Sequence, residues 1–152
     1  METTEKSVDV LNDLIEINND RVAGFEKASK DLGEGEFELK GLFDRFAAES
    51  RTYASELSSE VARVGGEAET GTSGTGALHR AWLDVKATFS GHDRKSILEE
   101  CERGEDAIKK AYRTALDPEN ELAFEAADLV RRQQQGINAA HDQIKALRDS
   151  QE

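Results

Sequence analysis

Apolar side chains recur every three to four residues along most of the chain, the spacing that places them on one face of an α-helix. No stretch shows the strict alternation of apolar and polar residues that a half-buried strand requires. With one proline in the whole sequence, the pattern favours an all-α protein built from long helices. The predicted helices span about 4–32, 36–64, 76–90, 93–116 and 118–148.

The connections between these helices indicate how they are arranged. Gly33 ends the first helix, since glycine readily adopts the left-handed conformation that closes a helix. Asp117 and Pro118 form a stop and a restart, with an N-cap aspartate followed by proline at the first helical position. Both connections are short and predict antiparallel hairpins. The 65–92 connection exceeds the usual length of roughly two to eight residues, and its glycine-rich part, 65–76, is expected to be flexible.

A long connection between two hairpins is the mark of a crossover along a helical bundle. We therefore predict an up-down-down-up four-helix bundle, the ferritin-like topology, with the short 76–90 helix packed on its outside. The 152 residues are expected to form a single domain, 1–152.

The charge of the chain restricts its partners. Asp and Glu number 32 against 20 Lys and Arg, for a formal net charge of −12. Because this field repels phosphate, we expect binding neither to nucleic acid nor to a membrane surface. No segment reaches the roughly 18 apolar residues of a membrane span, and the N-terminus lacks the apolar core of a signal peptide, so we expect a cytoplasmic protein. The single cysteine, Cys101, lies on an apolar face and is expected in the core.

Polar side chains interrupt the apolar stripes of all four long helices. Glu105 falls within the stripe of the 93–116 helix and Glu49 within that of the 36–64 helix. Asn18 and Asn19 occupy the middle of the first helix, and Gln133 interrupts the last. A buried carboxylate is costly unless it is paired, protonated, hydrogen-bonded or bound to a metal. We therefore expect these five residues to form a buried polar layer.

Four stretches resemble an uncharacterised bacterial family of ferritin-like four-helix-bundle proteins, a domain-of-unknown-function family. They are LNDLIEINND (11–20), GALHRAWLDVK (76–86), ECERGED (100–106) and AHDQIKALRD (140–149). The resemblance spans nearly the whole chain. The resemblance implies a ferritin-like fold and a bacterial origin. It implies no activity, because the family has no agreed one.

Gly104 and Glu105, with Tyr112 seven residues on, are more distantly similar to the metal-ligand helix of rubrerythrins and ferritins. Di-iron bundles take a Glu from each of two helices and a Glu-x-x-His motif from each of the other two. Glu105 and Glu49 fit two of these positions. Thr52 stands where the motif on the 36–64 helix would place its histidine, so this similarity implies at most a degenerate site.

The height of each residue along the bundle argues against a histidine ligand on the last helix. Counted from the turn at 117–118, Glu105 is level with about Leu129 to Gln133, and His141 lies on the order of 13 Å beyond that level. Three interpretations of the layer stay open. The first is hydrogen bonding between Glu and amides, with one carboxyl protonated and a neighbouring arginine or water; the others are one weakly held divalent cation and a dinuclear redox site. Iron, manganese and zinc are the candidate metals.

The three histidines are secondary candidates. His79 flanks the apolar face of the 76–90 helix, and His92 stands just before the 93–116 helix. His141 lies beside the apolar stripe of the last helix and is expected to approach His79 or His92. A surface site made of histidine and carboxylate at that end of the bundle is a further hypothesis.

These patterns favour a non-enzymatic binding or assembly role, without a cofactor, for a homodimer formed through one face of the bundle; the sequence identifies no other protein partner. The alternative is a divalent-metal-binding protein in iron handling or oxidative stress that uses Glu49 and Glu105. Hydrolytic and nucleotide chemistry have little support, because the chain lacks a G-x-S-x-G motif and a phosphate-binding loop with its lysine.

Overall fold

A computed structural model describes residues 2–33, 35–69 and 94–150, and within these ranges it is helical, with no strand. The all-α fold is therefore confirmed. The predicted helix over 76–90 and most of the predicted flexible segment lie outside the described residues. The helices are α1 (Glu2–Asp31), α2 (Phe37–Arg63), α4 (Arg94–Ala115), the 3₁₀ turn η1 (Pro118–Asn120) and α5 (Phe124–Asp149).

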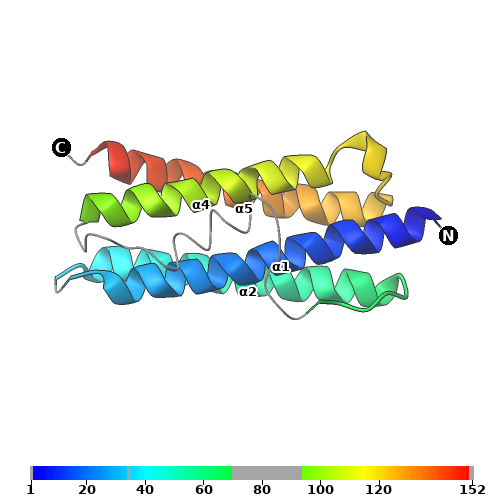
Figure 1. Ribbon diagram of the computed structural model, residues 1–152, viewed down its shortest axis with the longest axis horizontal. Helices are drawn as coiled ribbons and strands as arrows, with labels where there is room; N and C mark the ends of the chain where they lie inside the picture. Colours follow the sequence, from blue (N-terminus) through cyan, green and yellow to red (C-terminus); the bar gives the residue numbers. More distant parts are fainter. Residues whose placement is uncertain (1, 34, 70–93, 151–152) are drawn as a thin grey trace.

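The four long helices lie side by side in two antiparallel hairpins, α1 with α2 and α4 with α5 (Figure 1). Although they are consecutive among the described helices, α2 and α4 run in the same direction, and α1 and α5 run in the opposite one (Figure 1). This is the up-down-down-up arrangement that the long second connection predicts. Among the described helices, none is long and apolar enough to cross a membrane.

The last long helix begins later than the sequence predicts. The Asp117 side chain does accept a hydrogen bond from the backbone N–H of Glu119, at 2.9 Å, but the helix that it caps is only the single turn η1. Glu121 then adopts a left-handed conformation with φ 49°, which ends that turn. The chain continues without helix until Phe124, so residues of α5 sit at other heights relative to α4 than a start at 118 implies.

Among the described residues, the apolar core forms two clusters. They follow one another along the bundle, and residues of α1, α2 and α4 lie between them. In the first cluster, the Phe25 ring packs against the rings of Phe43 and Phe46, with centroids 5.4 and 5.3 Å apart. It also contains Cys101, which is completely buried as expected. The second cluster contains buried residues of all four helices: Leu11, Leu14, Ile15, Ile17, Leu57, Val61, Ile108, Ala111, Tyr112, Ala115, Ala126, Leu129, Val130 and Ile137.

Candidate functional site

The side chain of Arg21, on α1, is completely buried between the two apolar clusters. Its Nε and Nη2 donate to the two carboxylate oxygens of Glu105 on α4, at 2.7 and 3.1 Å. Its Nη1 donates to Glu49 on α2, at 2.8 Å. The planar guanidinium matches a carboxylate in this two-pronged geometry. One side chain therefore joins three helices and carries the charge opposite to both carboxylates.

Further contacts of Arg21 hold the guanidinium in place. Nη1 also donates to the hydroxyl of Ser50, at 2.9 Å, and to the backbone carbonyl of Phe46, at 3.4 Å. The guanidinium carbon lies 5.2 Å from the centre of the Phe25 ring and 5.5 Å from that of Phe46. Aromatic faces attract cations at such distances. Arg21 is thus bound by acidic, hydroxyl and aromatic groups together.

The pKa values of this centre reflect burial and pairing. Burial alone would lower the pKa of Arg21, but Glu105 and then Glu49 raise it above its ordinary value, so the guanidinium stays charged. Burial raises the pKa of Glu105 above its ordinary value, while the charge and hydrogen bonds of Arg21 act in the opposite direction. The charge on Glu105 therefore depends on Arg21.

Hydrogen bonds extend this centre toward the second apolar cluster. The Ser50 hydroxyl donates to Asn18 Oδ1 at 2.8 Å, and Asn18 Nδ2 donates both to the Leu14 carbonyl at 2.9 Å and to the Tyr112 hydroxyl at 2.8 Å. The Tyr112 hydroxyl donates to Gln133 Oε1 at 2.7 Å. The chain of bonds from Arg21 therefore reaches all four long helices, and buried polar atoms of the core satisfy one another.

The network returns to Glu49 through α5 and α2. Gln133 Nε2 donates to the Tyr53 carbonyl at 3.2 Å and to Glu56 at 3.1 Å. The Tyr53 hydroxyl hydrogen-bonds with Glu49, and burial is the largest cause that raises the pKa of this phenol. A Cβ on Gly136 would lie 1.9 Å from the Tyr53 hydroxyl. Gly136 therefore leaves the space on α5 in which Tyr53 reaches Glu49.

The five residues of the predicted polar layer lie inside the bundle to different degrees. Asn18 and Glu105 are completely buried, and Gln133 nearly so. Glu49 keeps 29% of its side chain exposed and Asn19 is half-buried. Gln133 is not level with Glu105, because its partner on α4 is Tyr112. The layer is therefore drawn out along the bundle instead of lying in one plane.

His141 lies beside Asp106 on α4, close to the level of Glu105. Its Nε2 is 2.5 Å from Asp106 Oδ1 on α4, and its Nδ1 is 3.3 Å from Asp142 Oδ1. The predicted separation of His141 from the level of Glu105 is wrong, because α5 begins at Phe124 and not at 118. His79 and His92 lie outside the described residues.

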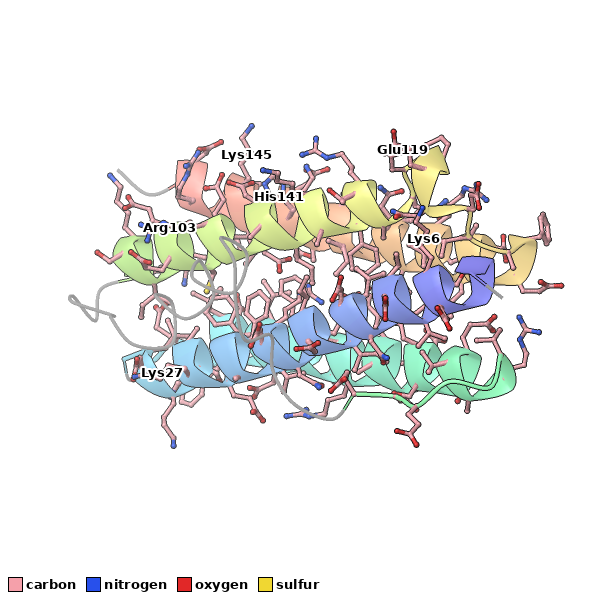
Figure 2. The ribbon with its side chains drawn as sticks, turned by 45° about the vertical axis from the view of Figure 1, so that its right-hand side comes forward. Lys6, Lys27, Arg103, Glu119, His141 and Lys145 are labelled. Atoms are coloured by element: carbon pink, nitrogen blue, oxygen red, sulfur yellow. The ribbon has the colours of Figure 1, made fainter. Side chains whose placement is uncertain are left out.

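Three side chains of α4 and α5 form a second cluster of possible ligands, which we call the α4–α5 triad: Glu102, Asp106 and His141. One ligand atom from each lies within 4.8 Å of the others. Glu102 and His141 are buried and Asp106 is exposed. Figure 2 shows His141 on the side of the molecule that α4 and α5 form, away from α1 and α2. A site of histidine and carboxylate was a hypothesis from the sequence, and the expected approach of His141 to His79 or His92 concerns residues outside those that the structure describes.

The residues at the centre of the bundle do not fit a di-iron centre. The two carboxylates there, Glu49 and Glu105, already bind the guanidinium of Arg21. Asn18 and Ser50, the other polar side chains beside it, are neutral oxygen donors. Dinuclear iron sites of such bundles use more carboxylates together with imidazoles. The centre is therefore an internal ion pair with hydrogen-bonded neighbours.

The sequence reasoning allowed for an arginine beside the carboxylates without identifying Arg21, and it missed the roles of Ser50 and Tyr53. Arg21 stands three residues after Asn18 and four before Phe25, so it shares their helix face. An arginine at an inward position one turn from an inward asparagine was the available signal. Tyr112 was placed on an apolar face, and its hydroxyl gave no separate signal.

Solved structures with the same fold are distant in sequence. A mutant of Mycobacterium smegmatis Dps1 has a TM-score of 0.77 at 14% identity, covering 97% of each chain. The dodecameric thioferritin of Bacteroides fragilis, a bacterioferritin-related protein, has a TM-score of 0.77 at 13% identity, covering 95% of this chain and 84% of its own. A ferritin-like diiron-carboxylate protein from Bacillus anthracis has a TM-score of 0.70 at 15% identity, covering 97% and 96%. They show the ferritin-like fold.

The expectation of a homodimer is corrected by this comparison. The neighbour whose assembly is named is a dodecamer, so the ferritin-like fold gives no reason to expect two subunits.

The family comparison agrees with the resemblance found in the sequence. A comparison with curated proteins gives no match. The model of a family described as "Domain of unknown function (DUF2383)" matches residues 6–118, which is most of the chain. This protein therefore belongs to the DUF2383 family.

Proposed function

We propose that this protein is a ferritin-like bundle with a non-enzymatic binding or assembly role, in which Arg21 supplies the positive charge that a metal would supply in a di-iron bundle. The observation that carries this proposal is the position of the guanidinium between Glu49 and Glu105. The fold alone would suggest iron chemistry, and this one side chain argues against it at the centre.

Competition for the same oxygens supports the proposal. Both carboxylate oxygens of Glu105 and Oε1 of Glu49 accept hydrogen bonds from Arg21. A metal ion bound there would have to expel the guanidinium from a completely buried position, away from the aromatic rings of Phe25 and Phe46 as well. Expelling a buried charge from its partners costs several kcal/mol. A cation that is part of the chain also cannot be lost or change its oxidation state.

The alternative is iron handling through Glu49 and Glu105. The likeness to a diiron-carboxylate protein favours it, because di-iron bundles use glutamates that project inward from facing helices, as Glu49 and Glu105 do. The donor set opposes it: the carboxylates are occupied, and His141 is bound to Asp106 and Asp142 instead of pointing to the centre. We therefore rank it second.

Ferrous titration in air separates the two functions. Protein purified without chelator or affinity metal is analysed for bound elements, and iron oxidation is then followed by absorbance in wild-type protein, Glu105→Gln and Glu49→Gln. We expect oxidation at the rate of buffer alone in all three proteins. Iron oxidation well above buffer that Glu105→Gln abolishes, and that His141→Gln leaves intact, would overturn the proposal.

The assembly role is tested by light scattering on the eluting protein. Because a neighbour with this fold is dodecameric, we expect a particle of many subunits. A monomer across the accessible range of protein concentration would exclude assembly and leave binding to another protein as the role.

A further inference from the structure

Glu102 and Asp106 stand one turn apart on α4, so their carboxylates share one face of that helix. His141 meets them from α5, and one ligand atom of each residue lies within 4.8 Å of the others. None of the three belongs to the hydrogen-bonded network around Arg21. The α4–α5 triad therefore lies outside that hydrogen-bonded network, although the charge of His141 acts on the pKa of Glu105. A binding role for the triad does not rest on the proposed function.

The carboxylate of Glu102 is poorly satisfied in the folded chain. The residue is only 8% exposed, and its Oε2 is buried and receives no hydrogen bond. Arg148 Nη1 lies 2.7 Å from this oxygen as an ion pair, but outside hydrogen-bond alignment. Arg148 also donates to Asp149, at 2.8 Å. A buried carboxylate is stabilised by a cation beside it, so a metal ion that displaced Arg148 would find a negative charge that needs a partner.

The imidazole of His141 is oriented as a metal ligand would be. Its Nδ1 lies 3.3 Å from Asp142 Oδ1, so this carboxylate can hold the Nδ1 proton. Its Nε2 lies 2.5 Å from Asp106 Oδ1, a distance that places a proton between these two atoms in the metal-free chain, and a metal ion bound to Nε2 would take the place of that proton. Histidine ligands commonly bind the metal through one nitrogen and give the other N–H to a carboxylate, which fixes the ring. Asp106 keeps 61% of its side chain exposed and is therefore free to turn and admit an ion.

We propose that Glu102, Asp106 and His141 bind one divalent transition-metal ion of the zinc type. One imidazole nitrogen and two carboxylate oxygens match the ligands that zinc takes at about 2.0–2.2 Å. The imidazole selects against Mg²⁺ and Ca²⁺, which prefer oxygen ligands alone. Three protein ligands leave a fourth position for water.

The local charge favours a divalent ion. Asp106 and Asp142 both approach the imidazole, and Glu102 completes the acidic surroundings with Arg148 as its paired cation. A bound ion would take the place of Arg148 on Glu102. The metal and Arg148 therefore compete, which makes the effect of removing Arg148 opposite to that of removing a ligand.

Titration of the full chain with Zn²⁺ by calorimetry, and with Co²⁺ by visible absorption, tests this site. We expect one ion per chain. His141→Gln and Asp106→Asn should each weaken Zn²⁺ binding at least about tenfold, since even groups that only support ligands contribute about 10–100-fold to affinity. The control is Asp128→Asn, which removes an exposed carboxylate of α5 that pairs with Arg132 and should leave the affinity unchanged.

Arg148→Gln should have the opposite effect on affinity and tighten Zn²⁺ binding severalfold, because it removes the cation that competes for Glu102. Far-UV circular dichroism and melting of each metal-free variant show that it is folded. Absence of Zn²⁺ binding by wild-type protein, or binding that His141→Gln leaves unchanged, would overturn the proposal. An ion that Glu105→Gln removes and Asp106→Asn does not would place the metal at the centre and overturn both this inference and the proposed function.

Discussion

Two regions of this bundle each bring a pair of carboxylates to a nitrogen base, and they differ in what surrounds the base. At the centre, the guanidinium of Arg21 is completely buried and takes both oxygens of Glu105. In the α4–α5 triad, the imidazole of His141 meets an aspartate that is mostly exposed. The contacts of the Arg21 guanidinium come from α1, α2 and α4, whereas the triad opens toward solvent through Asp106.

The guanidinium of Arg21 and the imidazole of His141 suit different roles. Arginine keeps its proton at any pH that a protein tolerates, and its charge is tied to the backbone of α1. Imidazole exists in a neutral form whose free nitrogen binds metals. The centre is therefore a permanent ion pair that concerns stability, and the triad is an exchangeable site that concerns binding. Substitutions in the two regions should report on different measurements.

Arg21→Met should have the largest effect on stability. It removes the cation and leaves the buried carboxylate of Glu105 without its partner, a situation that costs about 3–5 kcal/mol. Urea unfolding followed by circular dichroism measures the loss. The double variant Arg21→Met with Glu105→Met should regain much of it, because apolar side chains of similar volume often replace a buried ion pair at little cost. An Arg21→Met protein as stable as wild type would show that the ion pair does not hold the centre together.

Gly136→Ala should have the next largest effect. The added methyl group would meet the Tyr53 hydroxyl at 1.9 Å, so Tyr53 must leave Glu49, and we expect a loss of about 1–2 kcal/mol. The same change in a Tyr53→Phe background should cost clearly less, because the ring carbon Cζ, at 3.1 Å, is then the nearest atom. Gly41→Ala in α2 is the control: a Cβ there meets nothing within 4 Å, and alanine is the better helix former by about 0.5–1 kcal/mol. A Gly136→Ala variant that gains stability as Gly41→Ala does would contradict the close approach.

The pH dependence of stability should carry the signature of Glu105. Burial raises its pKa in the native state above the ordinary 4.5 of the unfolded chain. At a pH between the unfolded-state pKa and the native-state pKa, the native state therefore binds more protons than the unfolded chain. The free energy of unfolding therefore falls as the pH rises through this window. Glu105→Gln lacks this titration, and we expect the stability of wild type relative to this variant to decrease with pH. An increase would mean that Arg21 outweighs burial and lowers the pKa.

Lys27→Ala should have the smallest effect. Lys27 pairs with Asp31 at 2.7 Å one turn along α1, and 39% of its side chain is exposed. Solvent screens such a pair, which contributes about 0.3–0.5 kcal/mol. Thermal melting compared with the Arg21 variant measures the contrast directly. A loss as large as that of Arg21→Met would show that burial is not what distinguishes the central ion pair.

The fold followed from the sequence because apolar periodicity and loop length are local and regular signals. The start of α5 did not follow, because Asp117 and Pro118 signal a helix start without saying how long that helix is. The turn ends at Glu121, which adopts a left-handed conformation. Glycine is the usual signal for this conformation, and the sequence has a glutamate there. Because the predicted start of the helix was wrong, the predicted height of His141 was also wrong, and its contact with Asp106 was not foreseen.

The acids of the candidate centre were predictable by position, whereas its cation was expected only as an unidentified neighbouring arginine. Glu105 and Glu49 stood out because a carboxylate within an apolar stripe needs an explanation. Arg21 did not, because arginines in helices ordinarily extend their long side chains toward water. Whether such a side chain turns inward depends on partners that lie on α2 and α4, far away in the sequence. Those partners are visible only once the helices are packed together.

The position of Arg21 between two apolar clusters also bears on how the helices choose their alignment. Apolar stripes alone tolerate a slip of one turn, because a shift of about 5.4 Å brings the next set of apolar side chains into contact. A slip of α1 by that distance would separate Arg21 from Glu105, to which it now donates at 2.7 Å, and would leave both charges buried and unpaired. The ion pair therefore fixes the register of α1 against α2 and α4, and it penalises every misaligned bundle more heavily than it stabilises the correct one.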